Sequence, residues 1–198
     1  NIPVLETELG VVYRRLGQPD VAARYYASAL RAWKDAGNTE WKARLLNNLG
    51  LLYHMTGRLE DALPFLEESL DVAKKSGYQW LQANEFISLG DLWTDLGDFE
   101  SAHGYYDQAL TIATQQGASL LIFYANFGDA RLKHLNGEFG QALYEYEQAE
   151  KSQVKLGLYE QALLNTERGV CLLKLGKLKE ALQVLRLAVD LFDQEQKE

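Results

Sequence analysis

Few side chains in this sequence could act as a nucleophile with a neighbouring base. The chain has one cysteine, Cys171, and three histidines, His54, His103 and His134, which could in principle supply a thiolate and an imidazole. Apolar residues flank Cys171, so it is expected to pack in a core rather than to react. The histidines lack the spacing of metal ligands and are expected to face solvent. We therefore predict no catalytic residues, no metal site, no cofactor and no enzyme activity.

Charge and composition limit the classes of partner. The 198 residues include 20 basic and 28 acidic side chains, a net charge of −8. This balance argues against direct binding of nucleic acid or an anionic membrane and favours a partner with basic character. One cysteine cannot form an intrachain disulfide, and no apolar run approaches the roughly 20 residues of a membrane span, so we expect a cytoplasmic protein. Because the sequence begins at Asn1 and its single methionine is Met55, we expect part of a longer protein or a processed protein.

Small residues recur along the whole chain with one period. Successive members of the first glycine series are 40, 40, 40 and 39 residues apart, and an alanine series follows the same period. The glycine series are Gly17, Gly57, Gly97, Gly137 and Gly176; Gly37, Gly77, Gly117 and Gly157; and Gly10, Gly50, Gly90, Gly128 and Gly169. The alanines are Ala22, Ala62, Ala102, Ala142 and Ala181. These series predict a repeat architecture.

Apolar residues between the glycines follow helical spacing, as in Leu59, Leu63, Leu66 and Leu70. A glycine at the end of such a run can adopt the left-handed conformation that closes a helix. Each repeat is therefore predicted to be two helices joined by a tight turn. The predicted repeats are residues 1–37, 38–77, 78–117, 118–157 and 158–198.

The second repeat shows the motif most clearly. Leu49 and Gly50 are followed by Tyr53, then by Gly57 and Ala62, and the other repeats carry related residues at these positions. Each repeat resembles a tetratricopeptide repeat (TPR), and the long period is similar to kinesin light chain, the spindle-orientation adaptors and bacterial regulators such as the maltose activator. The resemblance implies an all-α fold, a right-handed α-solenoid of about five TPR helix-turn-helix hairpins forming a single array over residues 1–198.

The fourth repeat departs from this pattern. Nine residues separate Gly128 from Gly137, where the other repeats have seven, and Arg131 replaces the expected aromatic residue. This spacing predicts that the first helix of the repeat is shifted or locally overwound.

The resemblance also implies where a ligand would bind, because the first helix of each TPR lines the concave face. The matching positions give the candidate site residues Arg44, Asn47, Asn48, His54, Asn84, Ser88, Asp91, Asn126 and Asp129. The outer repeats add Thr7, Glu8, Arg14, Thr166 and Glu167. Asparagine is a mediocre helix former, yet its amide suits the backbone of an extended peptide. The alternative, that these amides bond to neighbouring helices or to water, stays open.

Chaperone-binding members of the family capture a C-terminal carboxylate with paired Lys and Asn side chains. Here the corresponding positions hold Thr7, Val11, Asn48, Asn84 and Ser88, so only Asn48 matches. We do not expect carboxylate capture to be the main binding mode.

The leading hypothesis is a protein- or peptide-binding scaffold that serves as the interaction or sensor arm of a larger bacterial signalling or transcription regulator. One alternative is a small-molecule sensing arm, for which Trp41, Trp80 and Tyr124 are the candidate pocket aromatics. The other is an oligomerisation or spacer segment. Leucines such as Leu182 and Leu191 continue in the last helix without a following repeat, which predicts missing repeats or a homodimer through this uncapped C-terminal helix.

Overall fold

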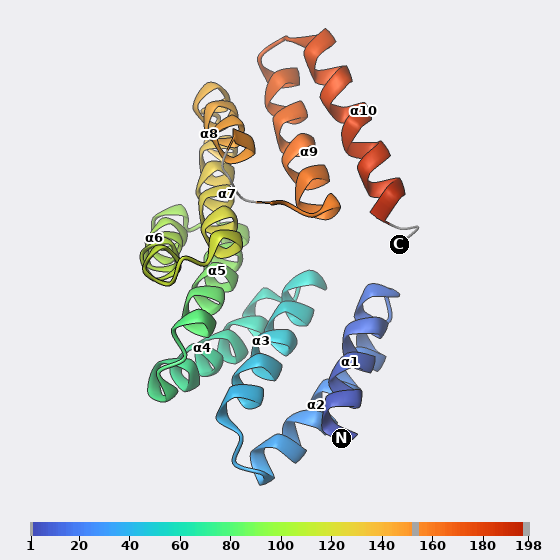
Figure 1. Ribbon diagram of the computed structural model, residues 1–198, viewed down its shortest axis with the longest axis vertical. Helices are drawn as coiled ribbons and strands as arrows, with labels where there is room; N and C mark the ends of the chain where they lie inside the picture. Colours follow the sequence, from blue (N-terminus) through green and yellow to red (C-terminus); the bar gives the residue numbers. More distant parts are fainter. Residues whose placement is uncertain (1, 152–154, 196–198) are drawn as a thin grey trace. The chain divides into compact units, whose positions relative to one another are not determined.

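The computed structural model of the protein describes residues 2–151 and 155–195, where it shows ten α-helices and no strand (Figure 1). The first six helices are α1 (Ile2–Arg15), α2 (Pro19–Asp35), α3 (Thr39–Met55), α4 (Leu59–Ser76), α5 (Gln79–Leu96) and α6 (Phe99–Gln116). The other four are α7 (Ser119–Leu135), α8 (Phe139–Lys151), α9 (Leu158–Lys174) and α10 (Leu178–Glu195). The predicted all-α solenoid fold is confirmed.

Successive helices pair as antiparallel hairpins, each inside one predicted repeat (Figure 1). The chain divides into two compact units: unit 1, Asn1–Gln116, holds α1 to α6, and unit 2, Gly117–Glu198, holds α7 to α10. Each unit is described by itself below. The prediction that all five repeats form one array stays a prediction.

Glycines with left-handed backbone close most of the turns. Gly57 is typical: its φ is 75°, and its N–H donates to the His54 carbonyl oxygen at 2.9 Å. Seven other turn glycines have φ between 63° and 84°. Gly157 is the exception, because its φ is −69° and it forms the N-cap of α9. The prediction that Gly157 closes a helix was wrong, since α8 ends earlier, at Lys151.

A second set of glycines lets the two helices of a hairpin touch. A Cβ atom added at Gly90 on α5 would lie 2.5 Å from a ring carbon of Tyr106 on α6, so the aromatic ring packs directly on the α5 backbone. Ala102, also on α6, is fully buried. This packing fixes the orientation of the first helix and hence of its outward-facing polar residues.

The fourth repeat keeps this geometry without its glycine. Ala130 takes the position that Gly90 has in the third repeat, and it is buried in the same cluster as Tyr146. Helix α7 is continuous, and Gly137 after it has φ 84°. The predicted shift or overwinding of this helix was therefore wrong, because Gly128 is not the packing residue; Lys133, not Arg131, stands at the aromatic position.

Buried aliphatic and aromatic side chains form a core in each unit. In unit 1 it includes Tyr26, Leu45 and Leu46, and in unit 2 it includes Phe123 and Cys171. Among the described residues, none of the helices has the length and apolar character needed to cross a membrane.

Candidate functional site

A groove of about 360 Å³ lies over α1, α3 and α5, the first helices of the three hairpins of unit 1. We call it the unit 1 groove. Its polar lining residues are Thr7, Glu8, Arg44, Asn47, Asn48, Asn84, Glu85 and Ser88. Its apolar lining residues are Val11, Trp41, Leu51, Trp80 and Leu81. This volume lies in the range of ligand pockets, which is roughly 300–1,000 Å³.

The structure brings five of the nine predicted site residues together in this groove: Arg44, Asn47, Asn48, Asn84 and Ser88. They come from two successive repeats, on α3 and α5, which contact each other. Thr7 and Glu8 extend the polar lining onto α1.

Aromatic and charged neighbours hold Arg44 in place at one side of the groove. Its Nε and Nη2 atoms donate to Glu40 Oε1 at 3.1 and 2.9 Å. Its guanidinium lies 5.8 Å from the Trp41 ring centroid and 5.5 Å from that of Trp80. Trp41 in turn stacks on Trp33, with ring centroids 5.4 Å apart. This wall is therefore largely preformed.

Unlike Arg44, the asparagine side chains of the groove have unused hydrogen-bonding groups. Neither the Asn48 nor the Asn84 side chain has a hydrogen-bond partner among the described residues, although both are half-buried. The side-chain oxygen of Asn47 is buried and also has no partner there. Ser88 is already engaged, because its hydroxyl donates to the Asn84 carbonyl oxygen at 3.3 Å. The amides of Asn48 and Asn84 are thus available to a ligand.

Glu85 is the residue of this groove that sequence reasoning missed. Its side chain is 0% exposed, and neither carboxyl oxygen has a hydrogen-bond partner in the described part of the chain. Burial raises the pKa of Glu85 to about 8, against smaller opposing effects of the Ser69 hydroxyl and the Arg44 guanidinium. The repeat itself could have revealed Glu85, because the equivalent positions of the other repeats hold the apolar residues Leu5, Leu45, Ala125 and Leu164.

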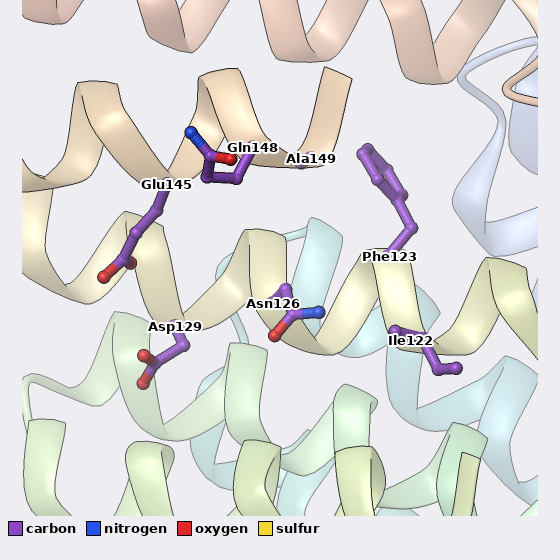
Figure 2. A pocket seen from close by; sticks show the side chains of 7 residues that line it. All are labelled: Ile122, Phe123, Asn126, Asp129, Glu145, Gln148 and Ala149. Atoms are coloured by element: carbon purple, nitrogen blue, oxygen red, sulfur yellow. The ribbon is translucent and has the colours of Figure 1, made fainter. Parts of the chain in front are cut away.

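Two predicted residues, Asn126 and Asp129, lie in unit 2. They line a pocket of about 370 Å³ between α7 and α8, together with Glu145 and Gln148 of α8 (Figure 2). Lys133 Nζ lies 2.6 Å from Asp129 Oδ2 and 3.0 Å from Glu145 Oε2. Burial alone would lower the pKa of Lys133, but these two carboxylates raise it above its ordinary value. Asp129 is thus neutralised by an internal cation.

The last two predicted residues bond to other side chains. His54 Nε2 lies 2.8 Å from Asp95 Oδ2, and the Tyr106 hydroxyl donates to Asp91 Oδ1 at 2.7 Å. The expectation of solvent-exposed histidines was wrong for two of three: the side chain of His54 is 11% exposed, and His134 pairs with Glu167 at 2.9 Å. These histidines link neighbouring repeats, a contact that the spacing within one helix cannot reveal.

The core position of Cys171 is confirmed, since its side chain is fully buried. Burial, and secondarily the charge of Glu167, raises the pKa of its thiol to about 11, which disfavours the thiolate. Among the described residues, there is no group of three or more His, Cys, Asp or Glu side chains that could hold a metal ion.

Comparisons with known sequences identify the family. Two sequence profiles described as tetratricopeptide repeat match residues 2–75 and 127–195. The chain belongs to the tetratricopeptide repeat family. No curated protein matches the sequence significantly.

Solved TPR proteins share the fold at low sequence identity. The Rap conjugation gene regulator of plasmid pLS20, in complex with the Phr peptide, matches with a TM-score of 0.85 and 18% identity over 96% of this chain and 53% of that chain. NprR in complex with its cognate peptide NprX matches with a TM-score of 0.81 and 18% identity over 95% of this chain and 55% of that chain. This TPR chain thus spans about half the length of those two chains.

A kinesin light chain-like protein of nearly identical TPR-like repeats from Podospora anserina has a TM-score of 0.66 and 16% identity, over 98% of this chain and 96% of that chain. At such identities, each likeness establishes the fold alone.

Proposed function

We propose that this chain is a peptide-binding TPR scaffold whose ligand lies along the unit 1 groove. The observation that carries the proposal is the pair of half-buried, unpartnered amides of Asn48 and Asn84 on adjacent helices of successive repeats. An amide offers one acceptor and two donor hydrogens, which matches the carbonyl and N–H of a peptide backbone.

The spacing of the helices suits this ligand. Axes of packed helices lie about 8–10 Å apart. An extended peptide rises about 3.3 Å per residue, so amides on neighbouring helices can reach backbone groups about three residues apart. The alternative that the Asn48 and Asn84 amides bond to neighbouring helices has no support among the described residues, because no side chain or backbone group there forms a hydrogen bond with either amide.

The structural likenesses support the same class of ligand. Rap of pLS20 and NprR were both solved with bound peptides, and both share this fold. We further propose that the chain is the interaction or sensor arm of a larger cytoplasmic signalling or transcription regulator.

The test is a selection of displayed peptides on the folded chain, beside the double variant Asn48→Ala/Asn84→Ala. The matched control is Gln115→Ala/Gln141→Ala, which removes two exposed amides outside the groove. Loss of one or two neutral hydrogen bonds of about 1 kcal/mol each weakens binding by about fivefold to thirtyfold. We expect the selected peptides to lose this affinity on the asparagine variant and to keep it on the control. Equal binding to all three proteins would place the peptide site elsewhere.

A small molecule is the second candidate ligand of the same groove. It is favoured by Trp80, which is 47% exposed and packs beside the Arg44 guanidinium with Trp41 nearby. A metabolite screen by thermal shift tests it. A compound that stabilises the wild type but not Trp80→Ala, together with absence of any selected peptide, would favour this candidate.

The homodimer predicted for the C-terminal helix stays a proposal. Leu182 and Leu187 of α10 are 51% and 48% exposed. Light scattering at increasing concentration tests it, and a strict monomer would contradict it.

A further inference from the structure

We propose that Glu85 makes the unit 1 groove selective for peptides that bring a positively charged nitrogen group, an ammonium or a guanidinium, to the groove floor. The inference rests on the proposed peptide-binding function and names the chemistry that the ligand must carry.

The first argument is the state of the Glu85 side chain. It lines the groove, yet it is fully buried and both carboxyl oxygens lack a partner among the described residues. The nearby Ser69 hydroxyl donates instead to the Ala43 carbonyl oxygen, at 2.7 Å. Buried polar atoms in folded proteins nearly always have a partner, and an unpartnered carboxyl is costly. A ligand that supplies the missing donor would resolve this cost.

The second argument comes from the repeat. Leu45, Ala125 and Leu164 fill the equivalent positions of other repeats, and each is at most 1% exposed. The fold therefore accepts an apolar side chain at this position and gains nothing from an acid there. Packing of the helices around this position therefore does not require the carboxyl of Glu85.

The third argument is the kind of partner that is missing. The side-chain oxygen of Asn47 is a further buried acceptor without a partner, and it lines the same groove. A site with several unused acceptors calls for a donor-rich group. An ammonium or guanidinium supplies several donors and a charge that the Glu85 carboxylate can balance.

The charges around Glu85 agree with this assignment. Among the described residues, the Arg44 guanidinium of α3 is the charge that acts on Glu85; α4 contributes the neutral Ser69 hydroxyl, and α6 contributes no charge. Arg44 is already paired with Glu40, and Glu8 of α1 adds another acid to the groove. Two carboxyl groups, those of Glu8 and Glu85, therefore line the groove together with one cation, Arg44, which already forms an ion pair with Glu40.

Such binding has a signature in its pH dependence. In the free protein, burial raises the pKa of Glu85 to about 8, so the group is mostly a neutral acid at pH 7. A cation favours the carboxylate, so binding expels the proton. The affinity for a peptide whose cation is Lys or Arg is expected to rise about tenfold per pH unit from pH 6 to 8 and to level off above pH 8.

The experiment is an affinity selection from four pools of short random peptides on wild type and Glu85→Gln. The pools contain or lack Lys and Arg, and their N-termini are free or acetylated. On the wild type, the acetylated pool without Lys and Arg should bind about 10- to 100-fold more weakly than the others, because it offers no cation. Enrichment of the free-amine pool or of the Lys and Arg pool identifies which source supplies the cation.

Glu85→Gln should remove this preference and the pH dependence, while Glu67→Gln, the same change at an exposed glutamate of α4, should keep both. Glu85→Leu reproduces the residue of the second repeat and guards against a folding defect of the amide variant. Equal binding of the cation-free pool to wild type, or an unchanged preference in Glu85→Gln, would overturn the role of Glu85 while the proposed function stands. Absence of enrichment from every pool would overturn both.

Discussion

The burial of Glu85 predicts that one amide substitution stabilises the protein in a pH-dependent way. The group has a pKa of about 8 in the folded chain, against an ordinary value of 4.5. Below pH 4.5 the carboxyl is protonated in both the folded and the unfolded state, so its ionisation does not change the free energy of unfolding. Between pH 4.5 and 8 the unfolded chain ionises while the folded chain keeps the proton, so the free energy of unfolding falls as pH rises. Above pH 8 both states are ionised and the cost is constant.

The magnitude follows from these two values. The free energy of unfolding falls by about 1.4 kcal/mol per pH unit within this window, which gives a cost of about 3 kcal/mol at pH 7. Glu85→Gln cannot ionise and should escape this cost. Glu85→Leu should gain further, because it also adds apolar burial at a position that holds Leu45 in the second repeat. For a chain of this size, about 3 kcal/mol corresponds to a rise in Tm of roughly 6–12 °C.

Urea unfolding followed by circular dichroism between pH 5 and 9 measures the effect. The quantity of interest is the difference between Glu85→Gln and wild type at each pH, because the titration of all other groups cancels in it. The difference should grow from pH 5 to 8 and then level off, whereas Glu67→Gln should show no such growth. A difference for Glu85→Gln that stays constant within about 0.5 kcal/mol from pH 5 to 9 would refute the unpartnered burial of Glu85.

Three further predictions concern packing and charge. Gly90→Ala should lower the free energy of unfolding by about 1–3 kcal/mol, because its Cβ would meet the Tyr106 ring at 2.5 Å, and a urea melt with wild-type stability would contradict this contact. Cys171 should react with a thiol reagent only in denaturant, since the thiol is buried and its pKa is raised to about 11; rapid labelling of the folded chain would show that the core is open. Lys133→Met should destabilise unit 2 by about 1–3 kcal/mol by leaving two carboxylates without their cation, and a loss that 1 M salt does not reduce would contradict an electrostatic origin.

Much of the fold could be predicted because its signals are local. A glycine with positive φ ends a helix wherever it stands, and the regular recurrence of such glycines marked the repeats before any contact was known. The position of Cys171 followed in the same way from its apolar neighbours. The prediction for the fourth repeat was wrong because it aligned Gly128 with Gly90, whereas Ala130 holds the equivalent position and is buried in the same cluster as Tyr146.

The candidate site was predictable in part, because helical period and repeat phase identify which positions of a first helix face outward. That reasoning selected Asn48 and Asn84, which the structure places in one groove. It also selected His54 and Asp91, which bond instead to Asp95 and Tyr106. Helical phase gives the direction of a side chain and not the identity of its neighbours.

The sequence by itself determined the helices, the turns and the repeat, because each depends on residues within a few positions of one another. Only the tertiary structure decided which polar groups keep their partners and which are left without one. The unpartnered carboxyl of Glu85 depends on α3 and α4 closing around α5, and the free amide of Asn48 depends on what α1 and α5 present to it. A hydrogen bond requires two groups within about 3 Å, and in a solenoid those groups come from different repeats, so the sequence of one repeat cannot specify it.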